Sequence, residues 1–475
     1  MPVNHVLLET IELGQSAASI TFDNIPTSGY SDLKIVSSIR SSRTSSTDGS
    51  HLVFKFNNNS DNLYSFKHIR GTGSAASSYS ETNQTSLNLY SQINSSSDTA
   101  NNFSNNSIYI PEYRSGFNKT VIVDSIYENN ATRGGQHLLS GVWASSAAIT
   151  SIVIQEGTSN NFVAGSTFSL YGISATGTSP AIGPKAQGGN IVANDGTYWY
   201  HAFLTSGTFT PTVALTSDVL VIAGGGSGGA GGNSGGAGGG GAGGLLYFSS
   251  QSVSTATNVV VGAGGPAVAT TGGIAYNGNT GNDSQFGALT LVKGGGYGGG
   301  GRLDNLSYSV GGTGGSGGGA GRWSNTGTVN GGAASPAGQG NAGGNSSTTG
   351  GGRGSGGGGG AGAAGTNGVN TTNNDGAGGA GINTYSTWAT ATSTGVSGYY
   401  AGGGGGSSVY TSNGTGGAGG GGAGGTAATS SAQSGTSGTY GTGGGGGGMG
   451  GGDASVLKTS GAGGSGIVII RYAMA

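Results

Sequence analysis

The chain has 475 residues and no cysteine, and its 18 acidic and 16 basic residues leave a formal net charge of −2. The lack of cysteine excludes disulfides and thiolate chemistry. Lysine and arginine are scattered and form no basic stripe, which argues against a nucleic-acid partner. Charged residues make up only 7% of the chain, against about 25% in typical soluble domains, and this favours an assembly part over an enzyme.

Short apolar stretches with a period of two recur through the first 175 residues. The alternation is clearest at Leu52–Phe56, and it returns at residues 20–22, 33–35, 121–123, 152–154 and 168–171. Clusters of Ser, Asn and Gly separate these stretches, a pattern that predicts many short strands. We therefore expect an N-terminal β-sandwich or jelly roll over residues 1–175. No stretch of ten or more residues shows a helical period.

Residues 176–189, with Pro180 and Pro184, are predicted to form a linker. A glycine-rich domain is expected over residues 190–475, because 97 of the 111 glycines follow residue 187. Collagen is excluded, since glycine does not recur strictly at every third position. Apolar runs at 219–223 and 467–472 argue against disorder. They predict two strands that pair and close the domain.

Oligoglycine can adopt an extended left-handed helix with three residues per turn. Without Cβ atoms such helices can lie backbone against backbone, and their amides and carbonyls can bond to one another. An interior helix must then be glycine on all three faces, as the run 443–452 is apart from Met449. A peripheral helix can carry small side chains, as the run 235–243 does. The expected fold class is all-β plus polyglycine II, with packed polyglycine helices closed by short strands.

Several segments together resemble the glycine-rich domain of phage tail proteins. They lie at residues 198–203, 206–209, 219–226, 243–246, 260–265, 284–287 and 463–472. The domain is similar in kind to the adhesins at the tips of phage tail fibres. In those proteins, loops between glycine helices contact the host receptor. Segments 22–26 and 164–173 of the first domain are similar to modules in virion proteins of marine phages.

Aromatic residues gather in the breaks between glycine runs. If the runs are struts, the breaks are exposed loops. Tyr and Trp among Ser, Asn and Gly make an adaptable contact surface, and their rings suit carbohydrate faces. The alternative is that rings cap the open ends of the glycine bundle or are buried between protomers. The candidate receptor-binding residues are Tyr308, Trp323, Tyr385, Trp388, Tyr399, Tyr400, Tyr410 and Tyr440.

Patterns that would indicate catalysis are weak. The five histidines are not grouped at metal-ligand spacing, so we expect no metal site and no cofactor. A pair of carboxylates could serve a glycosidase, but no spacing favours this chemistry. The acidic residues considered for it are Asp48, Asp61, Glu112 and Asp124. We expect no catalytic residue and no enzyme activity.

The favoured hypothesis is a phage virion protein, a tail-fibre adhesin that binds a host surface glycan or an outer-surface protein. Its N-terminal domain would contact other virion proteins or oligomerise, for example as a homotrimer. A capsid-decorating or other structural protein without receptor binding is the alternative. Ice binding is a more distant third. The start of the chain lacks a signal-peptide pattern, and no apolar run reaches the roughly 20 residues that span a bilayer. We therefore expect synthesis in a host cytoplasm and no membrane insertion.

Overall fold

A computed structural model describes most of the chain, and it divides into two compact units. The first unit contains residues 1–185, 190–199 and 473–475, and the second contains residues 186–189 and 200–472. The described residues are 5–44, 50–89, 93–129, 134–174, 183–232, 235–270, 274–301, 308–322, 328–347, 354–369, 375–407, 413–428, 431–451 and 457–474. Half of the expected linker, residues 176–182, therefore lies outside them.

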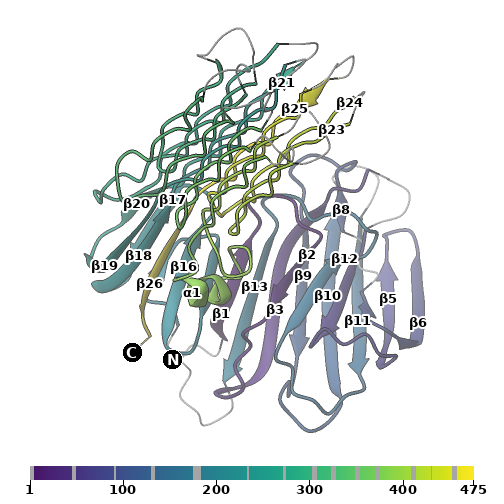
Figure 1. The fold of residues 1–475 in the computed structure, drawn as a ribbon. Coiled ribbons are helices and arrows are strands. Elements are labelled where there is room, and N and C mark those ends of the chain that lie inside the picture. The colour runs from purple at the N-terminus through teal and green to yellow at the C-terminus, as the bar shows by residue number, and fades with distance from the viewer. Residues whose placement is uncertain are drawn as a thin grey trace. The chain divides into compact units, whose positions relative to one another are not determined.

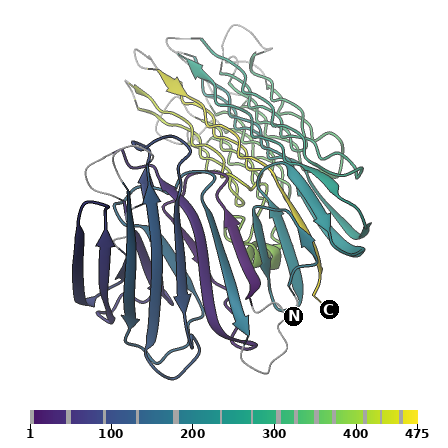
Figure 2. The ribbon, with the colours of Figure 1, turned by 180° about the vertical axis from the view of Figure 1, so that it is seen from behind.

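The first unit is built from two β-sheets (Figures 1 and 2). The larger sheet has the order β15-β1-β13-β3-β9-β10-β11-β5-β6, with antiparallel neighbours wherever a register is defined. Its strands are β15 (Ile191–Asn194), β1 (His5–Glu12), β13 (Thr167–Ser174), β3 (Tyr30–Ser41), β9 (Ser104–Ile110), β10 (Lys119–Glu128), β11 (Gly134–Trp143), β5 (Tyr64–Gly71) and β6 (Ala76–Gln84). The short strand β8 (Asn94–Ser95) pairs with β3 in parallel. The smaller sheet has the order β2-β12-β4-β7, with β2 (Ser19–Phe22), β12 (Ile152–Glu156), β4 (Leu52–Phe56) and β7 (Leu87–Asn88).

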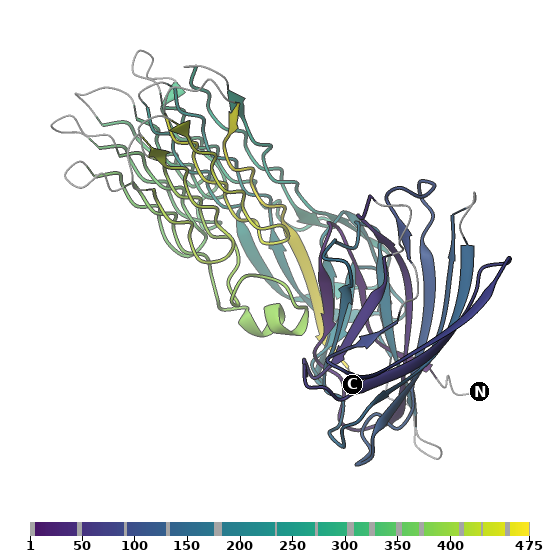
Figure 3. The ribbon, with the colours of Figure 1, turned by 90° about the vertical axis from the view of Figure 1, so that its right-hand side faces the viewer.

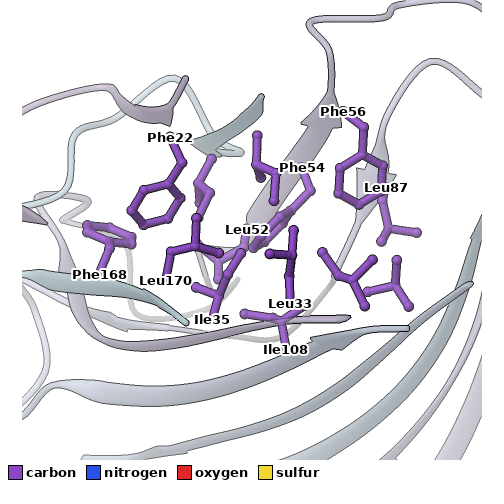
Figure 4. Close-up of a cluster of buried hydrophobic side chains, with 14 of the residues drawn as sticks. Phe22, Leu33, Ile35, Leu52, Phe54, Phe56, Leu87, Ile108, Phe168 and Leu170 are labelled. Atoms are coloured by element: carbon purple, nitrogen blue, oxygen red, sulfur yellow. The ribbon is translucent and has the colours of Figure 1, made fainter. Parts of the chain in front are cut away.

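The core of the first unit lies between these sheets (Figure 4). Phe22 and Phe54 enter it from the smaller sheet, while Ile35, Phe168 and Leu170 enter it from the larger one. All five side chains are 1% exposed or less, so each contributes roughly 1.5–3 kcal/mol by leaving water. Each predicted period-two stretch coincides with a strand, because alternating side chains place one apolar face in this core.

In the second unit, short strands accompany the glycine-rich segments. One sheet has the order β19-β18-β26-β16, and another has the order β14-β17-β20-β22. The strands are β14 (Ala186–Gln187), β16 (Tyr198–Phe203), β17 (Gly207–Pro211), β18 (Leu215–Ile222), β19 (Leu245–Val253), β20 (Thr257–Val260), β22 (Gln285–Phe286) and β26 (Ile467–Ala473). Two small ladders join β21 (Ala269–Thr270) to β25 (Lys458–Thr459), and β23 (Ala427–Ala428) to β24 (Ser431–Ala432).

The predicted closing strands pair as expected. β18 and β26 are antiparallel neighbours, with Val219 opposite Ile470 and Val221 opposite Val468. These four side chains are fully buried. The prediction of an all-β fold with a glycine-rich C-terminal domain is therefore confirmed.

Between the strands the glycine runs lie side by side as extended traces (Figure 3). In the run 224–230, every third amide donates to the same neighbouring run. The amides of residues 224, 227 and 230 donate to residues 276–282. Those of 225 and 228 donate to 461–464, and those of 226 and 229 donate to 238–241, with N···O distances between 2.8 and 3.0 Å. This period is the one that a helix with three residues per turn predicts. We interpret the runs as polyglycine II helices whose backbone polar groups satisfy one another.

The run 443–451 lies inside this lattice, as its composition predicts. Its described residues are all buried, and its amides donate to residues of several other runs. Gly445 illustrates the close packing, because a Cβ atom there would clash with the carbonyl oxygen of Gly240. Side chains are excluded where backbones approach this closely.

The expectation that the run 235–243 is peripheral is wrong. Its residues are buried, and Ala237 and Ala242 are 0% exposed. The Ala237 amide donates to the Ser407 hydroxyl at 2.7 Å, so a side chain takes the place of a backbone acceptor there. Small side chains are therefore accommodated inside the lattice, and alanine does not mark an outer face.

Candidate functional site

The eight aromatic candidates differ widely in exposure. Tyr308 is 37% exposed, and Trp323 and Tyr410 lie outside the described residues. Tyr385, Tyr399 and Tyr440 are half-buried. The Tyr440 hydroxyl donates to the Leu204 carbonyl at 3.1 Å. The structure therefore does not present the candidates as one exposed set.

For two candidates the expected exposure is wrong. Trp388 is 3% exposed and Tyr400 is 0% exposed. Burial raises the pKa of Tyr400 to about 12, and its hydroxyl hydrogen-bonds to Thr394 Oγ1. The reason is that the break 382–400 folds back on the domain instead of projecting from it.

This break is closed by a backbone bridge and contains a helix. Ile382 and Tyr400 exchange two hydrogen bonds of 3.0 Å, which bring the ends of the segment together. The helix α1 (Ser386–Ala391) is described between them, and it has no side-chain cap at its N-terminus. At its C-terminal end the Thr392 hydroxyl donates to the Trp388 carbonyl at 2.6 Å. Six residues without a side-chain N-cap form a marginal helix, so packing must hold α1 in place.

The packing comes from rings on three strands. The Trp388 ring lies 5.8 Å from the ring of Tyr200 and 6.0 Å from that of Tyr247. The Arg471 guanidinium lies 4.6 Å from the centroid of the Trp388 ring, within the range of a cation–π contact. Trp388 therefore anchors α1 on β16, β19 and β26.

A second aromatic contact lies nearer to solvent. The rings of Tyr247 and Tyr385 are 5.5 Å apart with an angle of 33° between their planes. Tyr247 is 39% exposed and Tyr385 is half-buried. The rings of Tyr385 and Trp388 are 5.9 Å apart. Tyr247, Tyr385 and Trp388 thus form one cluster, which we call the aromatic cluster.

An ion pair lies beside the aromatic cluster. Arg471 Nη2 is 2.6 Å from Asp218 Oδ2, and the Ser250 amide donates to Asp218 Oδ1 at 3.0 Å. Burial acts to raise the pKa of Asp218, but the hydrogen bonds from Arg471 and Ser250 outweigh it, and the pKa is lowered. Burial and the Asp218 carboxylate raise the pKa of the Tyr247 hydroxyl. Burial also raises the pKa of the Tyr385 hydroxyl. Asp218 and Arg471 therefore stay charged and paired, while Tyr247 and Tyr385 stay neutral.

The sequence did not indicate Tyr247, Asp218 or Arg471. Asp218 and Arg471 stand opposite each other on β18 and β26, far apart in the chain. One signal was present, since Arg471 is a charged residue at the end of an apolar run. Only the strand pairing shows which carboxylate it meets.

Among the described histidines, His68 and His137 lie close together, with ring centroids 6.0 Å apart. Within the described residues, no three of the His, Asp and Glu side chains are grouped to hold a metal. Asp48 lies outside those residues, and Asp61, Glu112 and Asp124 lie after β4, after β9 and within β10. His201 is 0% exposed and bonds to the Gly188 carbonyl at 2.6 Å and the Tyr472 hydroxyl at 3.0 Å. Both of its nitrogens are engaged in holding the fold.

The outer face of the larger sheet in the first unit carries a groove of about 870 Å³. Its exposed apolar side chains come from three neighbouring strands. Ile69 is 61% exposed, Ile122 is 56% exposed and Leu138 is 52% exposed. Ile69 stands opposite Leu138 in the β5–β11 register, so the apolar surface is continuous. Lys67, Ser78 and Ser140 border it.

Over the described ranges, no helix has the length and apolar character needed to cross a membrane. A comparison with curated proteins finds no match. The family model described as "Glycine-rich domain" matches residues 204–473. This match covers more than half of the chain and includes β18, the glycine runs and β26. The protein therefore belongs to the glycine-rich domain family.

Proposed function

We propose that this protein is a phage virion component, a tail-fibre adhesin that attaches the particle to the host surface. The hydrogen-bonded lattice of glycine runs carries the proposal. Backbone hydrogen bonds hold most of this lattice, so the segments joining the runs can vary without disturbing it. Surface loops on a rigid scaffold are the usual location of binding residues.

Composition and chemistry support binding over catalysis. The chain has few charged residues, and the described residues hold no grouped metal ligands. Receptor contact by Tyr308 is part of the proposal, as is contact by Trp323 and Tyr410, which lie outside the described residues. The receptor would be a host glycan or an outer-surface protein.

The N-terminal sandwich would attach the protein to other virion proteins, or to further copies as a homotrimer. The exposed groove of Ile69, Ile122 and Leu138 supports this role, because an apolar surface shared by three strands marks an interaction site. The protein would be made in the host cytoplasm and function in the virion.

Adsorption to host cells tests the proposal. Purified full-length protein is expected to bind host cells and to compete with phage for infection. Tyr308→Ala is expected to weaken adsorption, because the side chain is 37% exposed, and its melting curve shows whether the variant remains folded. Protein that binds capsids but leaves infection unaffected would instead indicate a capsid-decorating role and would exclude the adhesin.

A further inference from the structure

Tyr247 and Tyr385 expose aromatic surface beside α1. Trp388 is the ring that fixes α1, and it is buried by the strands beneath it. Tyr247 lies at the edge, on β19, and keeps 39% of its surface exposed. The Tyr385 hydroxyl has no hydrogen-bond partner among the residues that the structure describes. A bound ligand would therefore supply the hydrogen-bond partner of this hydroxyl.

The polar groups next to these rings are fixed in position. Asp218 and Arg471 are joined at 2.6 Å, and their side chains retain 21% and 20% exposure. The Ser250 amide holds the second carboxylate oxygen. A charged donor and a charged acceptor are thus held side by side at the border of an aromatic surface, a pairing that can serve hydroxyl groups as donor and acceptor.

The charges also limit which ligand the surface can take. Arg471 already lies over the Trp388 ring, so a cationic ligand would meet a like charge at the best cation–π position. An anionic ligand would meet the Asp218 carboxylate that neutralises Arg471. A neutral ligand with a flat apolar face and a hydroxyl border fits both the rings and the ion pair.

We propose that Tyr247 and Tyr385 form a binding platform for a neutral pyranose sugar, with Asp218 and Arg471 contacting its hydroxyls. One sugar face stacks on the two rings, and the Tyr385 hydroxyl supplies a further hydrogen bond. This inference rests on the proposed function for its biological role. It assigns glycan recognition to the surface of the second unit where β18, β19 and β26 lie beside α1.

A printed glycan array with labelled full-length protein is the first test. Binding to neutral hexose oligosaccharides is expected. The strongest of these is then titrated against the protein, with intrinsic tryptophan fluorescence as readout, because Trp388 lies within 6.0 Å of both tyrosine rings. Tyr247→Ala and Tyr385→Ala are each expected to weaken binding by about tenfold or more, as loss of a stacking ring at a contact centre does.

Matched variants make the result specific. Tyr276→Ala removes a tyrosine of similar exposure, 41%, from another part of the unit and is expected to bind as the wild type does. Tyr247→Phe keeps the ring and is expected to retain most of the affinity even if Tyr247→Ala misfolds.

The inference is overturned if no neutral glycan binds, if only charged glycans bind, or if both alanine variants match Tyr276→Ala. Adsorption to host cells that survives both alanine variants overturns the platform as the receptor site and leaves the adhesin intact. Glycan binding without adsorption contradicts the adhesin instead.

Discussion

At the scale of single residues, the absence of a side chain determines whether the second unit can fold. Gly445 and Gly240 illustrate this, since their backbones are too close for a Cβ atom between them. The sequence predicted Gly445 to be interior because glycine occupies all the neighbouring positions. It could not predict the interior position of Ala237, because the lateral neighbours of a run depend on how distant runs assemble.

Gly445→Val is therefore expected to destabilise the second unit by more than about 3 kcal/mol, since overpacking here is against backbone that cannot move aside. Thermal unfolding followed by circular dichroism measures the change. Gly207→Ala is the control, because a Cβ atom there meets only the Phe203 ring, at 3.3 Å. A wild-type melting curve for Gly445→Val would contradict the close packing.

His201 gives the second unit a defined response to acid. Burial lowers the pKa of His201 to about 4 from 6.5. The unfolded chain gains the proton below pH 6.5 and the folded chain only below about pH 4, so stability is complete above this window and falls as the pH drops through it. The loss by pH 4 is expected to be about 3 kcal/mol.

Thermal unfolding at pH 7, 5.5 and 4 measures this dependence for wild type and for His201→Gln, in which it should be much weaker. His137→Gln is the control, since that ring lies in the first unit and burial also lowers its pKa to about 4. If the acid response of the second unit is the same in all three proteins, His201 is not its origin.

At the scale of elements, the strands were predictable and the helix was not. The alternation of apolar and polar residues predicts β4 and β12, because every second side chain of these strands enters the core. Helix α1 has six residues, too few for a period to appear, and rings from β16 and β19 hold it in place. These ring contacts also bury Trp388, although its position between glycine runs predicts an exposed loop.

Trp388→Ala is expected to release α1 from the strands and to destabilise the second unit by about 3–5 kcal/mol, the usual cost of removing a large buried ring. Thermal unfolding and proteolysis at residues 382–400 measure the effect. Trp388→Phe keeps an aromatic ring and should lose less stability. Unchanged protease resistance in Trp388→Ala would show that α1 is held by other contacts.

At the scale of the whole molecule, the two units use different cores. The first unit excludes water with apolar side chains, whereas the second satisfies amides and carbonyls between glycine runs.

Hydrogen exchange distinguishes such a lattice from a solvated chain, because amides bonded inside it exchange only when it opens. We expect slow exchange at residues 224–230 and 443–449, and faster exchange at exposed Thr384 and Asn383. Exchange within seconds throughout residues 223–466 would exclude the lattice.

Because the hydrogen-bond partners in a run repeat every third residue, each run has a fixed phase relative to its neighbours. Losing one or two residues inside a run would rotate everything after the deletion by one or two thirds of a turn, toward the wrong partners. Losing three would restore the original phase. Changes in length within the joining segments leave that phase untouched. Insertions and deletions tolerated by this protein should therefore come in threes along the runs and in any number between them.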